Sequence, residues 1–309
     1  MLQTRAIYNL FRLNAAEGAA VQSEPWALED LRGVDLEELF SRLRQKEVQL
    51  DRHSFCQFSD QCDTPEEMTD LLLPDEATDA ERDPFYLIVF ELWRRLIPEK
   101  RSLSIFCDEL DHQISLYDLG DIHSDEPIQD ALAYLLEILD ENADSGADPE
   151  EILRAVSEYC AHDLESFVTD YISDLLDSGN SLYASELIEG FSPYVSDPFW
   201  FDFLRMRLIS FTDIGDANLA MHRLLENELD VSLLLEIIRF LSANGEYELF
   251  KTALQKTIPQ LTDPEEIVEV THFLADFYHR LDEEDKEQKV HEVLAQGKEI
   301  QVSDLKALL

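Results

Sequence analysis

Five short segments of this chain carry the sequence pattern of a helix start. In each, an Asp or Thr that can cap a helix precedes a proline at the first helical position, where a missing N–H leaves no hydrogen bond unmade. The five capping residues are Thr64, Asp83, Asp148, Asp197 and Asp263. At three of them, Thr64, Asp148 and Asp263, a Glu follows the proline and completes a capping box. The pattern therefore predicts five helices.

The residues behind these starts have helical spacing. After Asp263, apolar residues recur every three or four positions, and a similar stripe follows Asp197. The segment from Phe85 to Phe90 is apolar on all sides and continues into a helical pattern, so we expect a central helix there. Only 9 of the 309 residues are glycine, which disfavours sandwiches, barrels and phosphate-cradling α/β folds because these need many turns with positive φ. We expect an all-α fold.

We expect the chain to divide into two domains, because 309 residues suit either two domains or one long repeat array. The stretch after Leu73 lacks large apolar residues, and residues 74–83 predict an exposed acidic loop. Gly, Asp, His and Ser cluster between Gly120 and Pro127. We place the boundary there, with an N-terminal helical domain over residues 1–120 and a repetitive helical domain over residues 121–309.

Helical hairpins are predicted in the second domain. Their junctions lie at Gly179, Gly215 and Gly245, with a glycine-free junction near Asp282, and the spacings are 36, 30 and about 38 residues. A small residue stands five positions after the first two glycines, and a large apolar residue follows four positions later. These pairs are Ala184 with Ile188 and Ala220 with Leu224; the third glycine instead has Phe250 in the small position and Leu254 in the large one.

Over about residues 150–298, this pattern resembles the tetratricopeptide-like (TPR-like) helical repeat superfamily, whose repeats are about 34 residues long. No repeat in this chain carries the full motif series of that superfamily. The resemblance implies a TPR-like α-solenoid whose grooves bind peptides, helices or other proteins. Stacking has a physical cause as well: a single hairpin cannot bury its own apolar face, so neighbouring hairpins pack together and leave an extended concave surface.

Acidic residues dominate the charge of the chain. There are 67 Asp and Glu against 24 Lys and Arg, a formal net charge of −43, and residues 121–180 hold 17 acids and a single base, Arg154. This excess of acidic residues creates a negative electrostatic potential, which repels nucleic acids and anionic lipids and attracts basic proteins. It can also serve solubility alone. We expect a protein partner with a Lys/Arg-rich or amphipathic segment, and no direct contact with nucleic acid or membrane.

Other features of the sequence predict a cytoplasmic protein. No uncharged run approaches the length of a membrane span. The six uncharged residues from Ala6 to Phe11 are too few for the apolar region of a secretory signal. The four cysteines are too few and too scattered for a disulfide scaffold, and are expected to be reduced thiols.

Three arrangements of residues could bind a metal or act as a nucleophile: Cys56 with Cys62, the pairs Glu269 with His272 and Asp276 with His279, and Cys160 with His162. The two cysteines of the first have the wrong spacing for a zinc knuckle. The two carboxylate–histidine pairs lie roughly 10 Å apart along one helix, too far to share a di-metal centre. The third places thiol and imidazole on different faces of a helix. We expect no enzyme, no cofactor and no metal.

Aromatic residues cluster between Phe191 and Phe201, more than one amphipathic stripe can bury. Either they pack the junction between hairpins, or they form a hydrophobic anchor ringed by carboxylates that holds a basic amphipathic segment. The predicted partner-binding residues are Trp200, Phe201, Tyr194, Glu137, Asp140 and Glu141. The predicted function is that of a non-enzymatic protein-binding adaptor or chaperone. The alternatives are an acidic DNA mimic that inhibits a nucleic-acid-binding protein, and a metal-dependent hydrolase.

Overall fold

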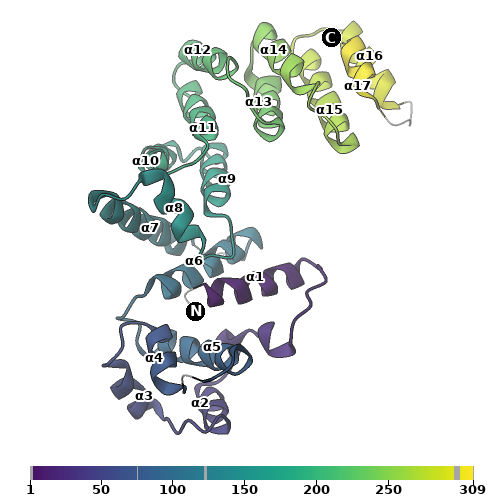
Figure 1. The fold of residues 1–309 in the computed structure, drawn as a ribbon. Coiled ribbons are helices and arrows are strands. Elements are labelled where there is room, and N and C mark those ends of the chain that lie inside the picture. Colours follow the sequence, from purple (N-terminus) through teal and green to yellow (C-terminus); the bar gives the residue numbers. More distant parts are fainter. Residues whose placement is uncertain (1–2, 75, 122–123, 296–299, 309) are drawn as a thin grey trace. The chain divides into compact units, whose positions relative to one another are not determined.

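A computed structural model describes residues 3–74, 76–121, 124–295 and 300–308. Throughout these residues all regular structure is helical, with seventeen α-helices, two short 3₁₀ helices and no strand (Figure 1). The expectation of an all-α fold is confirmed. No helix in the described part of the chain is both long enough and apolar enough to cross a membrane.

The helices fall into two compact units. Unit 1 comprises Met1–Val168 with Pro193–Val195, and unit 2 comprises Thr169–Ser192 with Ser196–Leu309. Before α9, unit 1 contains α1 (Thr4–Ala16), η1 (Pro25–Ala27), η2 (Leu31–Gly33), α2 (Leu36–Gln45), α3 (Arg52–Ser59), α4 (Pro65–Leu72), α5 (Asp79–Leu96), α6 (Leu103–Asp118), α7 (Glu126–Asp144) and α8 (Pro149–Ser157). From α9 (Leu164–Asp177), which the division crosses, unit 2 continues through α10 (Ser181–Phe191), α11 (Pro198–Ser210), α12 (Ile214–Leu224), α13 (Val231–Asn244), α14 (Tyr247–Thr257), α15 (Pro264–Arg280), α16 (Glu284–Ala295) and α17 (Val302–Leu308).

The expected boundary near residue 120 lies inside unit 1. Helix α6 lies before the expected boundary and packs against α1. The same helix also packs against α7, which lies after the expected boundary. Because α6 contacts helices on both sides, unit 1 extends past residue 120.

The core of unit 1 is centred on α5, as expected for its apolar segment. Every residue from Phe85 to Trp93 is buried. Side chains from α2, α3 and α4 belong to the same core: Leu39, Phe40, Leu43, Phe55 and Met68. A helix that is apolar on all sides is stable only where other elements surround it, and α5 meets this condition.

Four of the five predicted helix starts are confirmed. Thr64, Asp148, Asp197 and Asp263 each occupy the N-cap of a helix. The side chain of each accepts a hydrogen bond from a backbone N–H in the first turn. These contacts span only two or three residues, so the local sequence is sufficient to specify them.

The start predicted at Asp83 is wrong. Helix α5 begins at Asp79, because Thr78 and Glu81 form a reciprocal capping box upstream. Pro84 consequently lies in the second turn of the helix, where it removes one intrahelical hydrogen bond. The acidic loop expected over residues 74–83 is therefore shorter and ends at Thr78; residue 75 lies outside the described residues.

Unit 2 consists of consecutive helix pairs joined by short connections. Helix α11 packs on α12, α13 on α14 and α15 on α16. Tyr171 of α9 meets Tyr183 of α10 edge-on, with ring centroids 6.5 Å apart. Neighbouring pairs also touch, through α10 with α11, α12 with α14 and α13 with α15 (Figure 1). The predicted helical hairpins are thus present, and their assembly into a superhelix stays a prediction.

Two of the residues used to predict the hairpins have clear structural roles. Gly179 has φ of 80°, and the N–H of Asn180 donates to the carbonyl of Leu175 at 2.8 Å. A left-handed glycine followed by such a bond is a common way to end a helix. Phe250, which stands where a small residue was expected, is buried and stacks on Phe277 of α15 with ring centroids 3.8 Å apart.

Candidate functional site

The three predicted carboxylates all lie on α7 in unit 1. Glu137, Asp140 and Glu141 are exposed. Asp140 accepts a hydrogen bond from the hydroxyl of Tyr194. The next basic residue along the chain, Arg154, is paired at 3.4 Å with Glu151. The exposed side of α7 is therefore strongly acidic.

The three predicted aromatic residues do not form one exposed cluster. Tyr194 and Phe201 are buried, with 4% and 2% of their surface exposed, and they belong to different units. Only Trp200 is partly exposed, and it packs on the core of unit 2 while lining a pocket. Successive residues of a helix point about 100° apart, so Phe201 turns into the core when Trp200 faces the pocket. This corrects the expectation of a joint aromatic anchor.

Trp200 lies in a groove of unit 2 that is formed by α9, α11 and α13. Its cavity measures about 450 Å³. The ionisable and aromatic side chains that line it are Asp170, Asp174, Asp177, Trp200, Phe203, Arg207, Glu236, Arg239 and Phe240. We call it the Trp200 groove. It combines three aromatic rings with four carboxylates and two arginines.

Carboxylates hold both arginines of the groove. Arg207 donates to Ser173 Oγ at 2.6 Å and is paired with Asp177. Arg239 lies 2.8 Å from Glu236 Oε1 and 2.8 Å from Glu269 Oε1. Four lining carboxylates therefore face two arginines whose charge is already shared with acidic partners.

Glu236 is the least exposed of the acids in the groove. Its side chain is 32% exposed, against 70% for Asp177. Burial raises the pKa of Glu236, Glu269 and Asp170 add to the rise, and the opposing effect of Arg239 and Arg207 does not cancel it. Burial therefore disfavours the charged carboxylate by more than the ion pair with Arg239 at 2.8 Å favours it.

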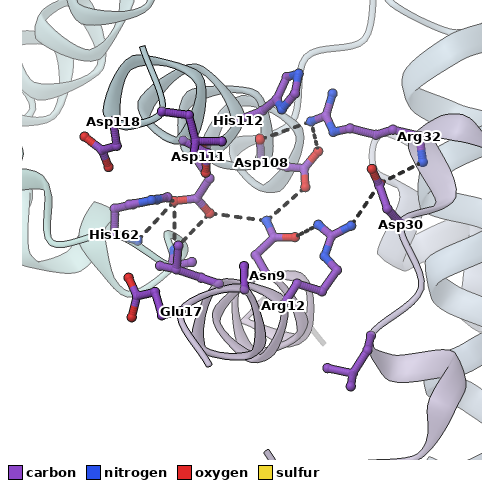
Figure 2. A pocket seen from close by; sticks show the side chains of 16 residues that line it. Asn9, Arg12, Glu17, Asp30, Arg32, Asp108, Asp111, His112, Asp118 and His162 are labelled. Carbon is purple, nitrogen blue, oxygen red and sulfur yellow. Dashed lines mark hydrogen bonds and ion pairs between the residues drawn. The ribbon is translucent and has the colours of Figure 1, made fainter. Parts of the chain in front are cut away.

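A second pocket of about 450 Å³ lies in unit 1 between α1 and α6 (Figure 2). Its apolar walls are formed by Leu13, Ala16, Leu28, Leu119 and Ala161. Figure 2 shows Asp118, His162 and Glu17 at the end of the pocket away from Arg32. Burial and the neighbouring Arg32 lower the pKa of His112, which lines the same pocket.

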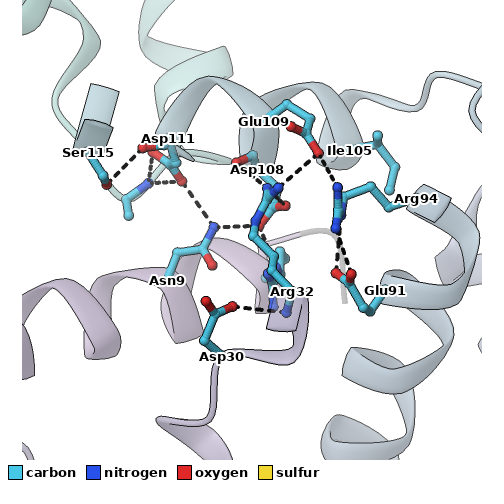
Figure 3. A network of polar contacts seen from close by, with 12 residues as sticks. Asn9, Asp30, Arg32, Glu91, Arg94, Ile105, Asp108, Glu109, Asp111 and Ser115 are labelled. Atoms are coloured by element: carbon cyan, nitrogen blue, oxygen red, sulfur yellow. Dashed lines mark hydrogen bonds and ion pairs between the residues drawn. The ribbon is translucent and has the colours of Figure 1, made fainter. Parts of the chain in front are cut away.

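Asp108, which also lines this pocket, forms the centre of a buried network (Figure 3). It accepts hydrogen bonds from Arg5 Nε at 2.6 Å, Asn9 Nδ2 at 2.9 Å and Arg32 Nη2 at 2.5 Å. Burial alone would raise the pKa of Asp108, but the two arginines and the bond from Asn9 outweigh it and hold the pKa well below its usual range. The network joins α1, η2 and α6.

Asp111 fixes the segment between α8 and α9. It accepts hydrogen bonds from the backbone N–H groups of Ala161 and His162 and from Asn9 Nδ2, and lies 2.9 Å from His162 Nδ1. An Asp–His pair can orient an imidazole for acid–base chemistry. Here Nε2 of His162 is buried and has no hydrogen-bond partner among the described residues. The contacts of Asp111 are those of a carboxylate that holds a loop.

The residues considered for metal or nucleophile chemistry are placed as follows. His272 and His279 are exposed on α15. All four cysteines are free thiols. A hydrogen bond to Cys107 and burial raise the pKa of the Cys160 thiol well above its ordinary value, which disfavours the reactive thiolate. Across the described residues, no three His, Cys, Asp or Glu side chains are grouped so as to hold a metal ion.

Sequence reasoning identified Trp200 but not the acids that share its groove. Asp170, Asp174 and Asp177 are spaced by four and three residues, which places them on one side of α9, and this spacing was an available signal. No comparable sequence signal exists for Glu236, because it lines the groove from α13, a helix far along the chain. Comparisons with protein-family models, curated proteins and solved structures find no match for this chain.

Proposed function

We propose that this chain is a non-enzymatic binding protein, an adaptor or chaperone, which holds a basic or amphipathic segment of a partner protein in the Trp200 groove. The observation that carries the proposal is the composition of that groove. A partly buried indole lies beside four carboxylates and two arginines that are already paired. A hydrophobic anchor with acidic surroundings suits a segment that presents both apolar and cationic side chains.

The order of helices around the groove supports this proposal. The groove is lined by α9, α11 and α13, the first helices of three successive pairs. A stack of helix pairs leaves an extended concave surface that can receive a partner. We therefore propose that the pairs from α9 to α16 form such an array, with the groove as part of its binding surface.

The exposed acids of α7 suit the same kind of partner. Glu137, Asp140 and Glu141 lie in a stretch with 17 acids and one base. Surface charge of one sign speeds the approach of a partner of opposite sign, although it adds less to the affinity of the final complex. We propose that α7 contributes to the rate of association and the Trp200 groove to the affinity.

Substitution of Trp200 tests the proposal. Binding of a helical amphipathic peptide rich in Arg and Leu should weaken by about tenfold or more in Trp200→Ala, because a central anchor carries much of the binding free energy. The matched control is Phe211→Ala, which removes an aromatic side chain that is 57% exposed just beyond α11 and outside the groove. This control should bind as the wild type does.

Two results would contradict the proposal. One is binding that Trp200→Ala leaves unchanged, and the other is an equal loss in both variants. Binding of a nucleic-acid-binding protein that depends on Glu137 and Glu141 but not on Trp200 would favour the alternative, an acidic DNA mimic.

A further inference from the structure

We propose that the Trp200 groove receives the side chain of an arginine or lysine from the partner, with the cationic group beside Glu236 and the methylene stem on Trp200. This inference rests on the proposed function and specifies the contact that selects the partner. Glu236 thereby becomes a specificity-determining residue, although no local sequence pattern distinguishes it from the other acids.

The shape and lining of the groove suit a long cationic side chain. Glu236, Trp200 and Phe240 line one cavity of about 450 Å³. Long basic side chains bury their methylene stems against apolar surface and keep the charged end in a polar environment. A cation near an indole or phenyl ring gains further electrostatic attraction. The methylene stem would thus contact the aromatic rings of the groove, and the cationic group would lie beside Glu236.

The two arginines near Glu236 also bind other residues. On its own helix, Arg239 divides its guanidinium between Glu236 and Glu269 of α15. On α11, Arg207 is bonded to Ser173 and paired with Asp177. Arg239 is thus shared between Glu236 and a second acid, and Arg207 is held by residues of α9.

Further acids act on Glu236 from the other helices. Burial raises the pKa of Glu236. Asp170 of α9 and Glu269 of α15 act in the same direction as like charges, although more weakly than Arg239 and Arg207 act against it. A partner's cation would favour the charged form of Glu236, which burial disfavours, at the least exposed acid of the groove. A neutral segment would instead remove water from the Glu236 carboxylate without supplying a counter-charge, which is unfavourable.

Two peptides of equal shape provide the test. The first is a helical amphipathic peptide of Arg and Leu, and the second is the same peptide with citrulline in place of arginine, which keeps the hydrogen-bonding group but removes its charge. Titration calorimetry would compare the wild type with Glu236→Gln. The matched control is Glu186→Gln, which removes one exposed acid of α10 outside the groove.

The wild type and the control should prefer the arginine peptide by about tenfold or more, the scale of a buried charge pair. This preference should fall several-fold in Glu236→Gln. Binding to the wild type on the acidic side of neutral pH should also release protons, because a cation lowers the raised pKa of Glu236, and Glu236→Gln should reduce this release. Repeating the titration in buffers of different ionisation enthalpy measures the protons directly.

The inference would be overturned if Glu236→Gln kept the full preference for arginine and the same proton release. Should Trp200→Ala still weaken both peptides in that case, the proposed function would stand and only the role of Glu236 would fall. If Trp200→Ala weakened neither peptide, the proposed function would fall together with the inference.

Discussion

The hydroxyl of Tyr194 donates a hydrogen bond to the carboxylate of Asp140. Two residues that were predicted from the sequence to bind a partner are therefore hydrogen-bonded to each other inside unit 1. The bond joins the segment Pro193–Val195 to α7. Burial first, and Asp140 in addition, raise the pKa of Tyr194 to about 12.

Tyr194→Phe should lower the free energy of unfolding by about 1 kcal/mol, the usual net value of such a hydrogen bond. The effect should depend on pH. Because the folded pKa is raised above the unfolded value of about 10, this stabilisation is complete below about pH 10 and is lost as pH rises through 12. Ultraviolet titration of tyrosinate would detect one fewer late-titrating tyrosine in the variant. If the amplitude lost in the variant came instead from the tyrosines that titrate near pH 10, the bond would not form.

Asp108→Asn should destabilise unit 1 by about 3–5 kcal/mol, because Arg5 would remain buried without its full counter-charge. The depressed pKa of Asp108 stabilises the fold above about pH 4, and this contribution is lost as pH falls further. Denaturant unfolding at several pH values measures both effects. The control is Glu151→Gln at the exposed pair with Arg154, which should change stability by less than about 1 kcal/mol. Similar losses in both variants would contradict the central role of Asp108.

Phe203→Ala should cost unit 2 about 3–5 kcal/mol, because the side chain is 2% exposed and lies in the core of unit 2. Phe211→Ala removes the same ring from an exposed position and should stay within about 0.5 kcal/mol of the wild type. Thermal or denaturant unfolding compares the two directly. Equal midpoints would mean that Phe203 does not contribute to the core as described.

Glu137→Lys combined with Glu141→Lys should slow the association of a basic partner more than it speeds dissociation, because exposed charge acts mainly through long-range attraction. Asp140 is left intact in this variant because it holds Tyr194. Stopped-flow or surface-binding kinetics at low and high salt would measure the effect. An association rate independent of salt in the wild type would leave the acids of α7 as a solubility feature only.

The parts of this fold that could be predicted are those set by neighbouring residues. The caps at Thr64 and Asp263 need only a side chain and a backbone group two or three residues away, so the sequence is enough to predict them. The start at Asp83 was wrong because a second local signal, Thr78 with Glu81, lies just upstream and forms the cap instead. Competing local signals are decided by the packing of the whole helix.

The polar network of unit 1 could not be predicted in this way. Arg5 meets Asp108 across a separation of 103 residues, and His162 meets Asp111 across 51. An Arg or Asp that will be buried has the same local sequence character as one that stays in water. In the same way Trp200 stood out as an aromatic residue, whereas Glu236 is one of 67 acidic residues and acquires its character only from the helices around it.

The most direct test of a basic segment binding in the Trp200 groove is an NMR titration that follows the indole N–H resonances. The chain has three tryptophans: Trp26 and Trp93 in unit 1, and Trp200 in the groove. Adding the arginine–leucine peptide should shift the Trp200 resonance in a saturable manner and leave that of Trp93 in place, since its N–H is donated to the Lys100 carbonyl at 3.2 Å. Saturable binding of the peptide with no change at Trp200, or with changes confined to Trp26, would contradict the account.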